Sequence, residues 1–395
     1  MTNRQQAVIV SAVRTPMGSF SGLFSSIPSP RLGSVAIADA LKRIQVTGEQ
    51  IDEVLMGCVL SAGLGQAPAR QASIGAGLPH QVGAVTVNKV CGSSLQTVIM
   101  AARAIALGEA QVIVAGGMEN MTRAPFLLEK ARQGYRLGHG ELTDSLIKDG
   151  LWDVYNQFHM GNAGELCAAR YRFSRQEVDD FALESYSRAR EAITTGSFTR
   201  EIVPVEVPQK KGAPRIVTDD EEPNRVDLSR LRQLKPVFQD DGVLTVGNSP
   251  SCNDGAAALV VMAEEEAHRL GLLPMARIVG YAGAALAPEW FTIAPIEAIR
   301  RLLKQTGLVV SDIDLFEINE AFSVVSLAIN RELGLDAKKV NVNGGAVALG
   351  HPIGATGARI LTTLLHAMEA RDARRGLASL CIGGGEALAL IVERT

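Results

Sequence analysis

The sequence is poor in aromatic residues and has little excess of either charge. Phe, Trp and Tyr make up 5% of its 395 residues, and the formal net charge is −3. A nucleic-acid-binding chain is usually basic, so we expect no nucleic-acid partner. A small anionic ligand stays possible, because it needs only a local basic patch.

Cysteine and histidine are scarce and are not grouped for metal binding. The five cysteines stand apart, at Cys58, Cys91, Cys167, Cys252 and Cys381. None forms a CxxC pair, and the six histidines form no HExxH pattern. We therefore expect free thiols in a reducing compartment, with neither a disulfide framework nor a metal site.

Targeting segments are also missing. The apolar stretch Ala7–Val13 is broken by Arg14 and Pro16, so it predicts a strand rather than a signal sequence. We expect no run long enough to cross a bilayer, and the C-terminus has no peroxisomal address. These features favour a cytoplasmic protein that does not bind membranes.

The two ends of the chain resemble each other. QIDEVLMG (residues 50–57) resembles DIDLFEIN (residues 312–319), and LGEAQVIVAGGMEN (107–120) resembles RRGLASLCIGGGEA (374–387). Nearly equal spacing between these pairs indicates a duplication. Each copy alternates helical patterns with short β-branched runs, which predicts an α/β fold of mostly parallel strands, with helices sandwiching two sheets.

The middle of the chain differs from both copies. Charge density rises between residues 121 and 246, and Ser174 with Glu177 forms a capping box that predicts a helix start. We predict an N-terminal half (1–120, its sheet completed by 247–270), an inserted domain (121–246) and a C-terminal half (271–395). The insertion is either a solvated surface region or a lobe that covers a phosphorylated ligand.

Cys91 stands between an apolar strand and an Ala-rich helix, in VNKVCGSSLQ. A thiol at a helix N-terminus is stabilised as thiolate, which would lower its pKa below the free value of about 8.5. A lone cysteine is more often a small buried hydrophobe.

His351 lies before a Gly-rich helix start, in GGAVALGHPIGATGAR. Under the duplication it corresponds to Lys89, so Cys91 and His351 would lie at equivalent helix ends of the two halves. If the halves pack about a pseudo-twofold axis, these ends converge and form a Cys–His pair. Otherwise His351 satisfies loop carbonyls.

Two further segments carry polar groups beside predicted strands. Cys381 ends a strand and precedes three glycines, which suggests close backbone approach to a ligand; no GxGxxG dinucleotide motif follows. Asn319, in FEINEAFS, either holds a water or caps a helix.

Together these segments resemble the signature motifs of the thiolase family. The resemblance runs from VIVSAVRTPMGSFSG near the start to CIGGGEALALIVER at the end. It implies two similar α/β halves in a layered α-β-α-β-α core, with an inserted loop domain. By the same resemblance Cys91 takes the acyl group and His351 activates it. Cys381 is the acid/base, Asn319 orients a water, and the amides of Cys91 and Gly383 form an oxyanion hole.

The resemblance also implies acyl-CoA thioesters as substrates, coenzyme A (CoA) as substrate or product with no other cofactor, and a homotetramer. FHMG (residues 158–161) is similar to the segment of short-chain, acetoacetyl-CoA-type thiolases. A degradative 3-ketoacyl-CoA thiolase of broader chain length and a non-catalytic acyl-CoA- or lipid-binding relative are the alternatives. The expected CoA contacts are Leu151, His159, Met160, Arg225, Phe238, Ser249 and Phe322.

We predict that Arg225→Ala raises the KM for CoA and leaves kcat little changed. The substitution removes a cation expected to meet the adenine nucleotide, and such binding is equal in ground and transition states. Steady-state kinetics with varied CoA measure both constants. An unchanged KM would show that another residue meets the nucleotide.

Overall fold

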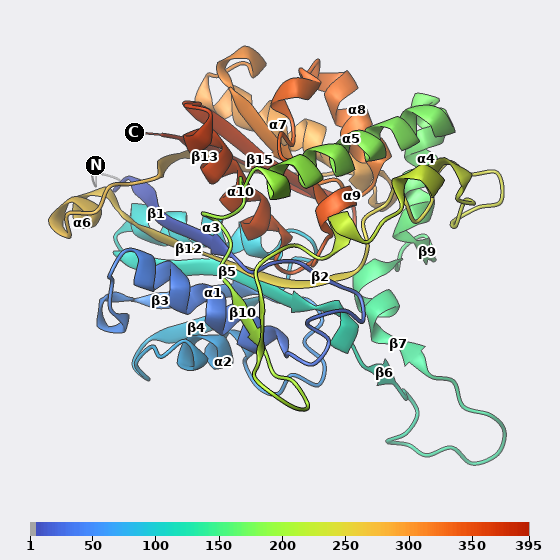
Figure 1. Ribbon diagram of the computed structural model, residues 1–395, viewed down its shortest axis with the longest axis horizontal. Coiled ribbons are helices and arrows are strands. Elements are labelled where there is room, and N and C mark those ends of the chain that lie inside the picture. The colour runs from blue at the N-terminus through green and yellow to red at the C-terminus, as the bar shows by residue number, and fades with distance from the viewer. Residues whose placement is uncertain (1–4, 395) are drawn as a thin grey trace.

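The computed structural model describes residues 5–394 and contains one large mixed sheet (Figure 1). Its N-terminal part has the strand order β1-β12-β5-β3-β4, and its C-terminal part the order β13-β16-β15-β14. A short pairing between β1 and β13 joins the parts. The bounds are β1 (Ala7–Arg14), β3 (Glu53–Gly57), β4 (Gly83–Val87), β5 (Val112–Asn120), β12 (Asn253–Ala263), β13 (Ala276–Ala285), β14 (Leu315–Ile318), β15 (Arg375–Ile382) and β16 (Glu386–Glu393), with β2 (Gly18–Ser19) beside β12.

The prediction of mostly parallel strands was wrong. Only the pairs β3–β4, β3–β5 and β14–β15 are parallel, and the other pairs of this sheet are antiparallel. Continuous apolar runs show that a strand is covered on both faces, but they do not show which way its neighbour runs. The predicted burial holds, since every residue of β5 and β12 is buried.

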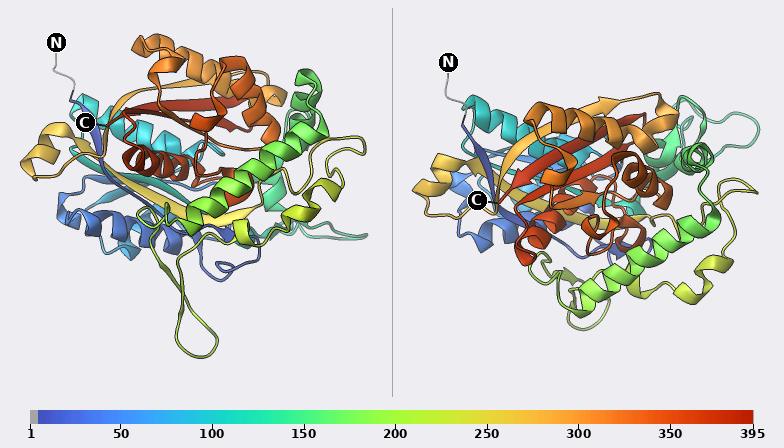
Figure 2. Two further views of the ribbon diagram at one scale, coloured as in Figure 1. Left: turned by 45° about the horizontal axis from the view of Figure 1, so that its top comes forward. Right: turned by 90° about the horizontal axis from the view of Figure 1, so that it is seen from above.

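Helices cover both faces of each part, giving five layers (Figures 1 and 2). Helices α1 (Ser29–Arg43) and α2 (Pro68–Gly75) lie outside the N-terminal strands, and α7 (Ala294–Thr306) and α8 (Ser323–Leu333) lie outside the C-terminal ones. Helices α3 (Ser93–Leu107) and α10 (Thr356–Ala370) pack together between the two parts.

Alternation along the strands explains the layers. In β12, Leu259 and Val261 face the central helices, whereas Val260 and Met262 face α1. Successive side chains of a strand point to opposite faces, so one strand serves two cores. The predicted layered α-β-α-β-α fold is confirmed.

The duplication predicted from the sequence is visible as repeated topology. The echoed segments form β3 and β14, then β5 and β15, and the central helices each have 15 residues. Beyond β14, a parallel bridge between Phe316 and Val340 occupies the place that β4 takes beside β3.

Residues 121–246 contain two long helices and short strand pairs. Helix α4 (Met160–Tyr171) is followed by α5 (Arg175–Thr194), whose capping box at Ser174 and Glu177 is present as predicted. The strand pairs are β6 (Phe126–Leu127) with β7 (Thr143–Asp144), β8 (Trp152–Asp153) with β9 (Phe158–His159), and β10 (Val205–Val207) with β11 (Arg215–Val217). The domain boundaries at residues 120, 246 and 270 stay predictions.

The remaining elements are short. Two further α-helices are α6 (Glu264–Arg269) and α9 (Ala346–Leu349), and a π-helical turn spans Leu146–Leu151. The 3-10 turns are Gly48–Gln50, Met121–Arg123, Glu222–Asn224, Leu228–Gln233, Pro288–Ile293, Val310–Asp312 and Ala337–Lys339.

One expectation about apolar runs needs correction. The window Val90–Leu107, which contains α3, is long and apolar enough to cross a membrane by length and composition alone. Its residues Leu95, Ile99 and Ile105 belong to the central core instead.

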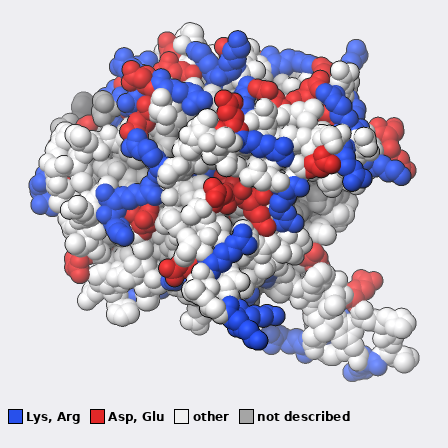
Figure 3. Space-filling model, in the orientation of Figure 1, with Lys and Arg blue, Asp and Glu red and all other residues white. Residues whose placement is uncertain are grey.

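On the face drawn in Figure 3, acidic and basic side chains are intermixed, in keeping with the small net charge.

Candidate active site

A cavity of about 450 Å³ brings together residues from both halves and from the inserted region. Cys91, His351 and Gly383 line it, so the two helix-start segments converge as the duplication predicted. Its wall is mostly apolar, as expected of a small-molecule site. The other lining residues are Met121, Gly150, Leu151, His159, Met160, Val237, Phe238, Val246, Ser249, Pro250, Ser251, Cys252, Phe291, Ala321, Phe322 and Ile353.

The turn before α3 presents Cys91. Val90 has a φ of +46°, an unfavourable value for a β-branched residue. Its amide donates to Asn88 Oδ1 at 3.0 Å and its carbonyl accepts from Ser93 Oγ at 2.6 Å. Strain of this kind persists only where the surroundings impose it, and it occurs often at active sites. Residue-type patterns gave no signal for Val90.

Thr356 orients the ring of His351. Its Oγ lies 2.6 Å from Nδ1 of His351 and 2.9 Å from the carbonyl of Pro352. We assign the hydroxyl proton to the carbonyl, so that Oγ accepts from Nδ1–H. This leaves Nε2 unprotonated and free to accept a proton. Burial, helped by the charge of Arg359, lowers the pKa of His351 to about 3, so the ring is neutral at pH 7.

The two thiols lie close enough to interact electrostatically. Burial raises the pKa of Cys381 well above its ordinary value, and a charge on Cys91 would raise it further. Cys381 is the last residue but one of β15, which ends at Ile382, and the predicted strand after the three glycines is β16.

The expectation of a lowered pKa at Cys91 was wrong. Burial raises the pKa of this thiol to about 11, although hydrogen bonds from the amides of Gly383 and Cys91 favour the thiolate. Removing the sulfur from water outweighs the amides, because a thiolate loses its hydration. Both Cys91 and Cys381 are therefore protonated in the resting site at neutral pH.

Asn319 is buried, with 1% exposure, and neither polar atom of its side chain has a hydrogen-bond partner among the described residues. Burying such a group unpaired costs about 1–3 kcal/mol. It does not cap α8, whose first residue is Ser323. Asn319 is not among the residues that line the cavity, and its catalytic role stays a prediction.

Most predicted CoA contacts lie together. His159 stacks on Phe238, with ring centroids 5.1 Å apart, and Phe238 meets Phe322 edge-on at 5.9 Å. Leu151, Met160 and Ser249 share the lining with these rings. The sequence gave no signal for Met121, Cys252, Phe291 and Ile353.

Arg225 is not among the residues that line this cavity. Its side chain is half exposed and pairs with Glu221 at 3.1 Å. Trp152, the residue after Leu151, lines a neighbouring hollow of about 550 Å³.

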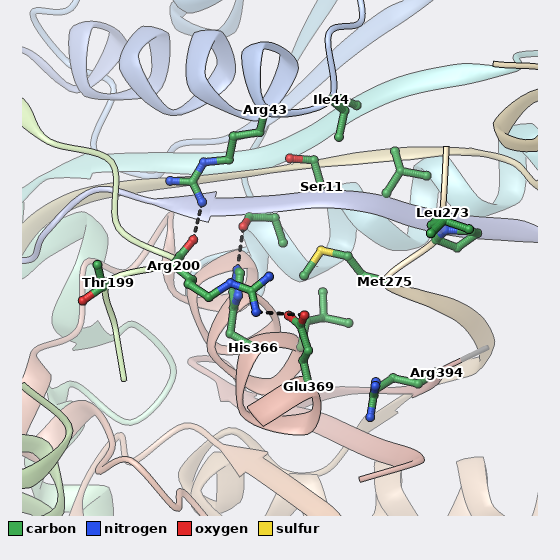
Figure 4. Close-up of a pocket in the computed structure, with 14 residues that line it drawn as sticks. Ser11, Arg43, Ile44, Thr199, Arg200, Leu273, Met275, His366, Glu369 and Arg394 are labelled. Carbon is green, nitrogen blue, oxygen red and sulfur yellow. Dashed lines mark hydrogen bonds and ion pairs between the residues drawn. The ribbon is translucent and has the colours of Figure 1, made fainter. Parts of the chain in front are cut away.

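A larger hollow, of about 610 Å³, lies where α1, β1 and α10 meet (Figure 4). Its charged groups already pair within the protein. Arg200 pairs with Glu369 at 2.8 Å, Arg43 pairs with Asp39 at 2.6 Å, and Nε2 of His366 meets the carbonyl of Ala12 at 3.0 Å. No cysteine lines it, so the cavity at Cys91 is the candidate active site.

Comparison with known families agrees with this geometry. Residues 7–265 match the thiolase N-terminal domain and residues 272–394 match the thiolase C-terminal domain. The chain belongs to the thiolase family.

Similar proteins include acetyl-CoA acetyltransferases. The one from Cupriavidus necator is 52% identical, over 98% of this chain and 99% of its own, and the one from Escherichia coli is 50% identical, over 99% of each. Among solved structures, an Ascaris suum thiolase in complex with coenzyme A is 43% identical with a TM-score of 0.95, covering 99% of this chain and 100% of that one. A Bacillus anthracis acetyl-CoA acetyltransferase is 40% identical with a TM-score of 0.98, covering both chains fully.

We predict that alkylation of Cys91 in the free thiolase is slow at neutral pH and accelerates as pH rises. With a pKa near 11, the thiolate fraction grows about tenfold per pH unit between pH 7 and 10. Iodoacetamide rates followed by peptide mapping separate Cys91 from the half-buried Cys252. A rate that is already constant above pH 7 would contradict a raised pKa.

Proposed function

We propose that this chain catalyses the reversible Claisen condensation of two acetyl-CoA molecules to acetoacetyl-CoA and CoA, through an acyl-Cys91 intermediate. The observation that supports this proposal most directly is one apolar cavity lined by Cys91, the neutral His351 and Gly383. Roughly 50% identity to acetyl-CoA acetyltransferases over nearly the whole chain supports the reaction class.

In the first half-reaction the sulfur of Cys91 attacks the acetyl-CoA carbonyl while Nε2 of His351 accepts the thiol proton. The carbon–sulfur bond to CoA then breaks, and CoA leaves with the proton of Cys381. In this scheme the amides of Cys91 and Gly383 donate to the oxyanion, and one such donor typically contributes about 3–4 kcal/mol.

In the second half-reaction the Cys381 thiolate takes the α-proton of the second acetyl-CoA. The resulting enolate attacks acetyl-Cys91, the new carbon–carbon bond forms, and the Cys91–carbonyl bond breaks. Cys91 recovers its proton from His351, so the enzyme returns to its starting state. A water held by Asn319, together with His351, would stabilise the enolate oxygen. Enolate formation is otherwise unfavourable near neutral pH.

CoA is the substrate and product in this scheme, and no other cofactor is needed. His159, Phe238 and Phe322 form the aromatic part of the cavity wall, which suits an apolar chain bearing a few polar groups. We propose that the adenine nucleotide lies outside the cavity, near the inserted region and Arg225.

We propose a homotetramer built from dimers. The edge strand β4 leaves Val85 41% exposed, and unpaired edges favour pairing with another chain. The arm between β6 and β7 projects from the body (Figure 1) and exposes Tyr135, Leu137 and Leu142. Sedimentation at micromolar concentration should give a single species of four chains, and a monomer would contradict the proposal.

We also propose a cytoplasmic location. The five cysteines are all free, as expected of a reducing compartment. Fractionation of the source cells with antibody detection would test this location.

We predict a preference for acetoacetyl-CoA over longer substrates. Leu151, Met160 and Phe322 crowd the cavity, and the sulfur of Met160 lies 3.3 Å from where a β-carbon on Gly383 would stand. Specificity is measured as the ratio of kcat/KM values for thiolytic cleavage. A higher kcat/KM for a ten-carbon 3-ketoacyl-CoA would indicate the degradative type instead, and cleavage of neither would count against a thiolase activity.

A further inference from the structure

Glu119 is a buried acid that the proposed reaction does not use. It lies near the end of β5 with 0% exposure. Its carboxylate accepts hydrogen bonds from the amides of Val59, Leu60 and Gly354, at 3.0, 3.2 and 2.9 Å. The thiol of Cys58, at 3.8 Å, is the one titratable side chain recorded within hydrogen-bond reach among residues 5–394. The carboxylate thus joins two loops that come from different halves.

Gly354 belongs to the turn that carries His351. Within this turn the amide of Ala355 donates to Pro352 at 2.9 Å, and Thr356 holds the imidazole. A β-carbon on Gly354 would stand 2.5 Å from Oε2 of Glu119, so the carboxylate rests directly on bare backbone. Any shift of the turn relative to β5 would break this hydrogen bond.

The N-terminal half also holds the other end of this turn, at His351. The amide of His351 donates to Oδ1 of Asn253 at 2.9 Å, and Asn253 in turn donates to the carbonyl of Gly18 at 3.0 Å. Cys91 belongs to the N-terminal half and His351 to the C-terminal half. Their separation therefore depends on ties of this kind across the boundary between the halves.

The same carboxylate supports the wall behind the nucleophile. Val59, Leu60, Met121 and Ile353 are buried in one apolar cluster, and Cys91 packs against it. Because Glu119 holds the amides of Val59 and Leu60, it fixes the surface on which Cys91 rests as well as the turn of His351.

The charge of Glu119 does not help Cys91 to become a thiolate. The negative charge raises the pKa of Cys91, which disfavours the thiolate. Burial also raises the pKa of Glu119 itself to about 7, although its hydrogen bonds lower it. An acid at this position therefore does not serve to lower the pKa of Cys91. Its side chain is long enough to accept hydrogen bonds from three amides, and this accounts for its presence.

We propose that Glu119 is a positioning residue that holds His351 against Cys91 through hydrogen bonds to backbone amides, and that the reaction requires its reach rather than its charge. The proposal rests on the proposed function, because it assigns His351 and Cys91 to one reaction.

Two conservative variants separate reach from charge. Glu119→Gln keeps the length and one acceptor oxygen, which can serve Val59 and Gly354 together, as Oε2 now does. Its NH2 group replaces Oε1, so of the three amides only that of Leu60 loses its acceptor. Glu119→Asp keeps the acid but withdraws it by one methylene group. Asp52→Ala is the control, since Asp52 also accepts two amides, those of Gln111 and Val112, at the opposite end of β5.

The measurements are kcat and KM for CoA in acetoacetyl-CoA cleavage, the pH profile of Cys91 alkylation, and the melting temperature. We expect Glu119→Gln to stay within about fivefold of the wild-type kcat, and Glu119→Asp to lose about 10²-fold, the scale of a 1 Å misplacement. The KM for CoA should change little in both. Alkylation should move to lower pH in Glu119→Gln, which lacks the opposing charge. Asp52→Ala should match the wild type in kcat, KM and alkylation profile, whatever stability it loses with its two hydrogen bonds.

A kcat for Glu119→Asp equal to or above that of Glu119→Gln, with both variants folded, would overturn the proposal and assign the role to the charge. A tenfold loss in Glu119→Gln at an unchanged melting temperature would do the same. If wild type and Asp52→Ala both fail to cleave acetoacetyl-CoA, the proposed function fails on its own, before the variants are compared.

Discussion

The packing of α3 against α10 is the contact on which the whole site depends. A β-carbon on Gly357 would stand 2.4 Å from the amide nitrogen of Leu95, so the helices approach more closely than a side chain would allow. Oγ of Ser94 accepts from the amide of Ala358 at 2.9 Å, which satisfies a free donor in the first turn of α10. This contact sets the first turns of the two helices side by side, and the turns before them carry Cys91 and His351.

Burial between the two parts of the large sheet has a chemical consequence. The same dry surroundings raise the pKa of Cys91 and Cys381 and lower the pKa of His351, so all three groups rest in their neutral forms. In the proposed reaction charge arises only when substrate is bound, in a site where the amides of Cys91 and Gly383 already hydrogen-bond to the sulfur of Cys91. Preorganised donors in a water-excluded cavity stabilise such charge more than water does, because they need no reorientation.

Much of this arrangement could be predicted from the sequence, for identifiable reasons. Glycines beside Cys91, His351 and Cys381 mark sharp turns, and the duplicated order of motifs predicts that the turns converge. Strand direction could not be predicted, since burial of both faces looks alike in parallel and antiparallel strands. The pKa of Cys91 was wrongly predicted because a helix end is visible in sequence whereas desolvation depends on the assembled fold. The role of Glu119 could not be predicted for a related reason. Its partners are backbone amides, and no residue type in the sequence indicates them.

The central claim is that Cys91 and Cys381, two thiols close enough to interact electrostatically, perform different steps. The most direct test incubates labelled acetyl-CoA with Cys91→Ala and Cys381→Ser, quenches at low pH, and maps the labelled peptide. Cys381→Ser should still acquire label on Cys91 while losing condensation by about 10²–10⁴-fold, the scale of general acid–base catalysis. Cys91→Ala should acquire none. Stoichiometric label on Cys381 in Cys91→Ala would contradict the account and exchange the two roles.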